Sequence, residues 1–169
     1  MKATSLLSSQ HRKVEALFKK LENGRADHGP VLQELANSLA AHMAIEQELF
    51  YPAVKEVDSE MIDESFEEHA LAELALKRLI ATDHEENEFN ARVVALKELI
   101  EHHVEEEEQE LFPKIEKHLD EEELDELGKQ MKARFQEVFD AGFAETVPKG
   151  MAKTSADAAK RSLNRRALA

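Results

Sequence analysis

The sequence contains one short motif twice, as His42-x-x-x-Glu46 and as His103-x-x-x-Glu107. A proline follows ten residues after each histidine. On an α-helix, side chains four residues apart lie on the same face, with their Cβ atoms roughly 5–6 Å apart. The imidazole and the carboxylate of each motif can therefore bind one metal ion. Nitrogen and carboxylate ligands together suit iron, manganese or zinc.

A further histidine precedes each motif, His11 in the first half of the chain and His69 in the second. The spacing to the motif histidine is 31 residues in the first half and 34 in the second. The chain thus repeats one helical hairpin that carries two histidines and a glutamate. Two such hairpins face to face would suit a pair of first-row metal ions. With Glu46 and Glu107 as bridges, each ion has two histidines and two carboxylate oxygens, and positions stay open for an oxo or hydroxo bridge and a small ligand.

The elements that must hold these residues are predicted to be helices. Hydrophobic residues recur at three-and-four spacing, and in the second segment this stripe is predicted to end with Leu49 and Ala53. Cap and stop signals divide the pattern into five segments. We expect helices at about 5–21, 30–57, 60–81 and 87–119, and a shorter one at about 120–139. Short connections favour antiparallel neighbours, so the predicted fold is all-α, an antiparallel up-down four-helix bundle with an additional short C-terminal helix. Pro52 and Pro113 predict a kink or a helix end beyond each glutamate.

Polar residues interrupt the hydrophobic stripes at seven places. A lone charge buried on such a seam is costly, so the interruptions need a common explanation, and a cation cluster supplies one. We leave Glu73 open between a further ligand, an acceptor for a ligand imidazole and a residue turned to solvent. Tyr51 is expected to pack in the core, with a hydrogen-bonding or redox role near the metals as the alternative, and His102 is expected on the surface. The seven interrupting residues are His11, His42, Glu46, His69, Glu73, His103 and Glu107.

Composition and charge exclude several other functions. A length of 169 residues suits one domain, predicted over residues 1–140, followed by a basic, flexible tail at 141–169. The absence of cysteine excludes disulfides and thiolate metal sites. No apolar run approaches the roughly 20 residues that a membrane helix needs, so we expect a cytoplasmic protein without a membrane partner. The net charge of −14 is concentrated before the tail and repels phosphate backbones, which argues against nucleic acid as a partner.

Four motifs in the same order make the chain resemble the hemerythrin-like, or HHE cation-binding, domains over about residues 5–119. The resemblance implies a four-helix bundle around a non-haem di-iron centre with an oxo or hydroxo bridge. It implies that the four histidines are terminal ligands and that Glu46 and Glu107 are bridges. The residues that carry the resemblance are His11, the stretch HMAIEQELFYP from His42 to Pro52, Glu68-His69, and the stretch HHVEEEEQELFP from His102 to Pro113.

One position departs from the oxygen-carrying hemerythrins, which have another histidine where this sequence has Glu73. The ligand set looks more like that of bacterial HHE proteins, including iron-centre repair proteins. The ferritin-like di-iron signature Glu-x-x-His does not occur in the sequence. The first hypothesis is therefore a di-iron protein that binds or senses dioxygen, nitric oxide or peroxide. The alternatives are a di-iron enzyme that turns over peroxide or nitric oxide, and iron storage or donation to damaged iron centres, with manganese or zinc as other metals and a redox partner protein unidentified.

Overall fold

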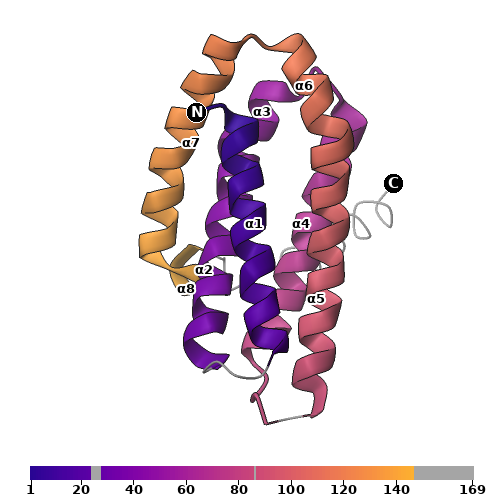
Figure 1. Ribbon diagram of the computed structural model, residues 1–169, viewed down its shortest axis with the longest axis vertical. Helices are drawn as coiled ribbons and strands as arrows, with labels where there is room; N and C mark the ends of the chain where they lie inside the picture. Colours follow the sequence, from indigo (N-terminus) through magenta and orange to yellow (C-terminus); the bar gives the residue numbers. More distant parts are fainter. Residues whose placement is uncertain (24–27, 86, 147–169) are drawn as a thin grey trace, which may run out of the picture.

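The computed structural model describes residues 1–23, 28–85 and 87–146, and this part of the chain is helical without a β-strand. Four long arms lie side by side and run up and down along the molecule (Figure 1). Each arm contacts its neighbours in a ring, so that α1 meets α2 and α5, and α4 meets the same two helices. The arms are α1 (Ala3–Glu22), α2 (His28–Ile45) continued by η1 (Glu46–Phe50) and α3 (Tyr51–Val54), α4 (Ser59–Ile80), and α5 (Asn87–Glu106) continued by η2 (Glu107–Leu111) and α6 (Phe112–His118).

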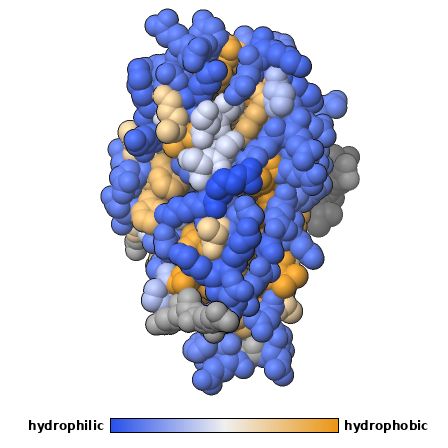
Figure 2. Space-filling view, viewed as in Figure 1, coloured by the Kyte–Doolittle hydropathy of each residue, from blue (hydrophilic) through white to orange (hydrophobic). Residues whose placement is uncertain are grey.

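The bundle is the all-α, four-helix arrangement that the hydrophobic spacing predicts. Asp58 begins α4 as an N-cap, with its carboxylate accepting a hydrogen bond from the Met61 backbone N–H. None of the described helices is both long and apolar enough to span a lipid bilayer. The face seen in Figure 2 is mostly hydrophilic, with separate hydrophobic patches. The predicted tail falls largely on residues 147–169, which lie outside the described residues.

A fifth long helix, α7 (Glu121–Ala141), packs along the outside of α1 and α2 (Figure 1). Asp120 and Glu123 form a reciprocal capping box at its start. The helix ends two residues beyond the predicted end at about residue 139, and a short helix α8 (Phe143–Thr146) follows it. Gly142 separates the two with a φ of 83°, a conformation that glycine adopts without strain. The last residue of α7 and all of α8 lie beyond residue 140.

Two hydrophobic clusters fill the bundle above and below a polar layer. One cluster contains Phe18, Leu35 and Leu96, and the other contains Leu7, Phe50 and Leu111. Along α1, Leu7 precedes His11 and Phe18 follows it, so the histidine lies between the clusters. On the second and fourth arms the chain order is reversed, with Leu35 and Leu96 before the histidine and Phe50 and Leu111 after it. The histidine of every arm thus lies between the two clusters, which places all four histidines at one level of the bundle.

A π-helical turn begins at each motif glutamate. The backbone N–H of Tyr51 donates to the carbonyl of Glu46, and that of Phe112 donates to Glu107, five residues back in both cases. Each arm continues past its proline as a helix, so the irregularity predicted at Pro52 and Pro113 is a wide turn just before each of them rather than a helix end. Such turns are frequent at functional sites.

The wide turn also rotates the rest of the arm. Phe50, Tyr51 and Val54 are buried, whereas Ala53, which the three-and-four spacing places on the seam, is exposed. The prediction for Ala53 is therefore wrong, because the extra residue in the π turn shifts every later side chain around the helix axis. Tyr51 consequently faces the interior below Glu46.

The close approach of α7 to the chain start depends on Gly128. A Cβ at this position would collide with the carbonyl oxygen of Met1 and lie 3.0 Å from the backbone nitrogen of Ala3. We predict that overpacking in Gly128→Ala lowers the free energy of unfolding by about 1–3 kcal/mol. The greater helix preference of alanine offsets up to roughly 1 kcal/mol of this loss. Urea unfolding measures the change. The exposed Lys132→Ala on the same helix is the control, and equal stability of both variants would show that α7 does not pack this closely.

Candidate metal centre

Four imidazoles from four different helices meet in the polar layer. His11 comes from α1, His42 from α2, His69 from α4 and His103 from α5, and each residue is at most 5% exposed. The Nε2 atoms form two close pairs. Nε2 of His11 lies 3.1 Å from Nε2 of His42, and Nε2 of His69 lies 3.1 Å from Nε2 of His103. The helices thus aim the same ring atom of every histidine at a common space.

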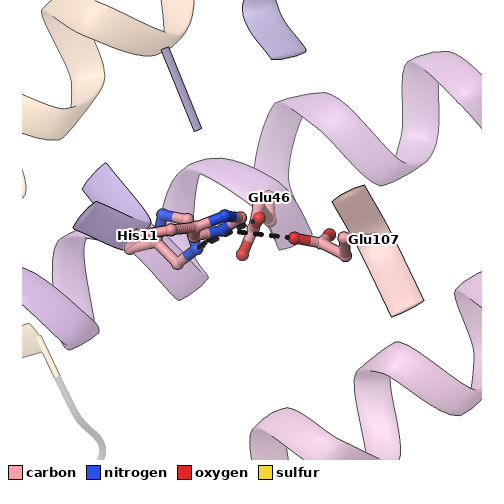
Figure 3. A group of neighbouring side chains, drawn as sticks. His11, Glu46 and Glu107 are labelled. Carbon is pink, nitrogen blue, oxygen red and sulfur yellow. Dashed lines mark hydrogen bonds and ion pairs between the residues drawn. The ribbon is translucent and has the colours of Figure 1, made fainter. Parts of the chain in front are cut away.

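Glu46 and Glu107 lie between the two histidine pairs. Oε1 of Glu46 is 3.2 Å from Nε2 of His42, and its Oε2 is 3.4 Å from Nε2 of His69. Glu107 spans the pairs from the other side, with Oε2 at 3.4 Å from Nε2 of His11 and 3.7 Å from Nε2 of His103. Figure 3 shows His11 and the two glutamates converging. Each carboxylate therefore reaches both pairs, which is the geometry of a bridging ligand.

The donor atoms fit two cations. Both oxygens of Glu46 and Oε2 of Glu107 are buried, and they have no hydrogen-bond partner among the described residues. Buried carboxylate oxygens without a partner are strongly unfavourable, and a cation would neutralise them. The buried donor residues form two sets, and within each set the donor atoms lie within 4.8 Å of one another. Glu46 belongs to both sets. The sets are His11, His42, Glu46 and Glu107, and Glu46, His69 and His103.

The second nitrogen of every imidazole is held by a side chain. Such outer partners fix the orientation of a ligand ring and tune its basicity. In each histidine pair, one ring contacts a carboxylate and the other contacts an amide, so the two pairs have matching surroundings. The contacts of Nδ1 are His11 with Glu108 at 2.8 Å, His42 with Gln10 at 2.7 Å, His69 with Gln47 at 3.0 Å, and His103 with Glu68 at 2.7 Å.

These four partners follow the internal repeat, and we did not predict them. Gln10 and Glu68 each precede a histidine of the first or third arm, while Gln47 and Glu108 each follow a motif glutamate. Each partner holds a ring on another helix, so the connection is not local. Aligning the two halves shows polar residues at equivalent positions, and that was the signal available in the sequence.

Tyr51 lies at the edge of the metal centre. Its hydroxyl donates to Oε1 of Glu107 at 3.0 Å and lies 3.3 Å from Nε2 of His69 and 3.5 Å from Nε2 of His103. The equivalent residue in the second half is Phe112, whose ring stacks 6.1 Å from that of His11. The π turns thus bring an aromatic ring to each histidine pair, but only the pair His69 and His103 meets a hydroxyl. The hydrogen-bonding alternative for Tyr51 matches this geometry.

Burial sets the protonation of the glutamates in the cation-free layer. It raises the pKa of Glu46 well above the usual value, and the neighbouring charge of Glu107 raises that pKa further. Burial acts in the same direction on Glu107, but His103 and His11 outweigh it and lower the pKa of Glu107 to about 2. One carboxyl thus holds a proton while the other is ionised. A cation that binds Glu46 must displace this proton.

The imidazoles respond to the same surroundings. Burial and the neighbouring His11 lower the pKa of His42 well below its usual value, and burial and His103 lower that of His69 to about 3. For His103, burial is outweighed by Glu107 and Glu68, so its pKa is raised. His42 and His69 are therefore neutral at physiological pH, which is the form that coordinates metal ions.

Two residues named in the sequence prediction lie apart from these donors. Glu73 forms an ion pair with Lys77 at 2.6 Å and belongs to neither donor set. The side chain of His102 is 63% exposed, as predicted, and forms a surface group with Glu68 and Glu106.

The bundle and its buried His and Glu residues define a helical cation-binding domain. The hemerythrin HHE cation-binding domain matches residues 2–115, and the chain therefore belongs to this family. A crystal structure of a hemerythrin HHE cation-binding domain-containing protein from Mycobacterium kansasii is 25% identical, with a TM-score of 0.76 over 90% of this chain and 96% of that one. A protein described as a DNA nickase from Nostoc sp. is 28% identical over 138 residues, and the match spans 79% of this chain but 39% of that relative.

The outer partners make a testable contribution to metal binding. We predict that Glu68→Ala weakens metal affinity about tenfold to a hundredfold, because His103 loses the carboxylate that orients its ring. Zinc titration against a competing chelator measures this affinity. Glu67→Ala, which changes the exposed glutamate next to it, should leave the affinity unchanged. Equal affinity in both variants would mean that Glu68 has no part in orienting the ring.

Proposed function

We propose that the chain binds two iron ions in the polar layer and that this centre binds or senses a small oxidant, namely dioxygen, nitric oxide or peroxide. The observation that supports the proposal is the position of Glu46 and Glu107, each within 3.7 Å of both histidine pairs. One ion would have His11 and His42 as terminal ligands, and the other would have His69 and His103. Bound iron would supply redox chemistry to the layer, with an oxo or hydroxo group as a further bridge.

The protein's own residues prepare the layer for this role. The two hydrophobic clusters flank it, and its four histidines are at most 5% exposed. Tyr51 places a hydroxyl beside His69 and His103, where it can act as a further donor to the ion or as a hydrogen-bond donor to a bound oxidant. Burial raises the pKa of Tyr51 well above its usual value, as do the charges of Glu46 and Glu107, so the phenol keeps its proton in the cation-free layer.

Turnover of peroxide or nitric oxide is the second candidate function, and the Tyr51 hydroxyl favours it because it supplies a proton donor within the layer. Iron storage or donation is less well supported, since each histidine ligand is at most 5% exposed and release would require the bundle to open. The proposal includes a redox partner protein and a cytoplasmic location but no nucleic acid, since the net charge is −14.

The bridging role of the glutamates has a direct test. We predict that Glu46→Ala and Glu107→Ala each lose at least one metal ion per chain, because each ion shares both carboxylates. Elemental analysis of anaerobically purified protein gives the stoichiometry and the identity of the metal. His102→Ala, next to His103 but exposed, should keep the full content. Full content in both glutamate variants would refute bridging, and loss in His102→Ala would mean that the wrong histidine was assigned.

Tyr51→Phe separates a ligand role from a packing role. If the phenol oxygen binds ferric iron, the air-exposed protein should show a visible phenolate-to-iron absorption band that disappears in Tyr51→Phe. Loss of the buried hydroxyl should lower the free energy of unfolding by only about 1–3 kcal/mol. Phe50→Leu, at a buried neighbour that faces the apolar cluster, should keep the band. An identical spectrum in Tyr51→Phe would show that Tyr51 is not a ligand.

Turnover distinguishes the two candidate functions. Steady-state consumption of peroxide or nitric oxide by the iron-loaded protein would select the enzyme. Stoichiometric binding without consumption would select the binding or sensing protein, and rapid loss of iron to a chelator would select donation.

A further inference from the structure

A cavity of about 310 Å³ lies between α1 and α5, and His11 is one of the residues that line it. These two helices lie next to each other on the face seen in Figures 1 and 2. The interior walls are the apolar side chains of Val14, Phe18, Ile100 and Val104. The His11 ring is the point where the cavity meets the metal centre, because its Nε2 lies 3.4 Å from Glu107.

The opening of the cavity is acidic. Four carboxylates and one guanidinium surround it, together with Gln109. Lys19 and Lys97 pair with two of these carboxylates from outside the cavity. The charged residues that line the opening are Arg12, Glu15, Glu101, Glu105 and Glu108.

Arg12, the cation among these lining residues, is already paired. Its guanidinium binds Glu108, whose other oxygen accepts a hydrogen bond from Nδ1 of His11, and it also lies 3.6 Å from Glu15. An anion entering the cavity would have to compete with these carboxylates for Arg12. The opening therefore offers an anion little attraction, and the net charge of −14 adds repulsion.

The internal repeat gives a reason for the cavity between α1 and α5. Val104 follows His103 as Met43 follows His42. Met43 is 7% exposed and belongs to the apolar cluster that contains Phe18, whereas the shorter Val104 is only half-buried. The longer methionine side chain at position 104 would reach into the space that valine leaves.

We propose that this cavity is the route by which small uncharged molecules reach the metal centre, and that it excludes anions. The inference rests on the proposed function and specifies the class of ligand. Apolar walls cannot replace the hydration of an ion, but they admit a neutral molecule at little cost. A water molecule takes about 30 Å³ in the liquid, so the volume accepts species from a diatomic gas to a small organic hydroperoxide.

Paramagnetic relaxation tests the route without requiring activity. The full chain, methyl-labelled and mixed with excess zinc, is examined by NMR with dissolved dioxygen and, separately, with an anionic carboxylate nitroxide. We expect dioxygen to relax the methyl groups of Val14, Ile100 and Val104 more than those of the fully buried Leu35 and Ile62. The nitroxide should leave the cavity methyls unaffected but relax the exposed Val94.

The two probes give a clear decision. If dioxygen relaxes the cavity methyls no more than those of Leu35, the route does not exist. If the anionic nitroxide relaxes them as strongly as Val94, the exclusion of anions is wrong. Because the readout comes from the protein methyls, it decides the route whether or not zinc binds.

A substitution in the cavity wall tests whether the route leads to the metal centre. Val104→Met should slow the binding of nitric oxide to the iron-loaded protein by about tenfold or more, since it narrows the approach to a buried site. Val94→Met, on the exposed part of the same helix, is the matched control and should bind at the original rate. Equal rates in both variants would overturn the route. Absence of iron from the original protein would instead refute the proposed function and leave the NMR result as the test of the cavity.

Discussion

The burial of two carboxylates in the middle of an apolar bundle is the constraint on which the rest of the structure depends. Glu46 and Glu107 are at most 1% exposed, and no lysine or arginine among the described residues is buried with them. Ionised carboxylates in such surroundings need a positive charge nearby. Four imidazoles from four helices surround them, and the arms must lie in register for this to happen. The requirement to surround two buried carboxyl groups with imidazoles thus fixes the relative heights of the helices.

The two halves of the chain meet this constraint by exchanging contacts. Glu108, on the fourth arm, holds the ring of His11, and Gln10, on the first, holds the ring of His42. The second half repeats the pattern, with Gln47 holding His69 and Glu68 holding His103. Each hairpin therefore orients one of its own histidines, through Gln10 or Glu68, and one histidine of the other hairpin, through Gln47 or Glu108. The metal centre belongs to the whole bundle, because each half needs the other to hold one of its two rings.

The sequence predicted the helices, the bundle and the residues that meet in the layer, because these follow from the helical repeat and from two copies of one motif. It did not predict the π turns. In such a turn a backbone N–H bonds the carbonyl five residues back instead of four, and this change leaves little trace in the hydrophobic spacing. Tyr51 was left open for this reason, and Ala53 was placed on the wrong face. The ring partners and the α1–α5 cavity depend on the packing of distant residues, and only the comparison of the two halves pointed to them.

Cation binding in the buried layer has a consequence for the lifetime of the protein. A ligand that binds only the folded state stabilises it by an amount that grows with the logarithm of its concentration, about 2.7 kcal/mol at a hundred times the dissociation constant. The folded population of this cation-binding chain is therefore linked to the supply of its ion. When the ion is scarce, this stabilisation is lost, and the fraction of unfolded chains available to proteases rises. The abundance of the protein would then follow the amount of free metal around it, without a separate regulator.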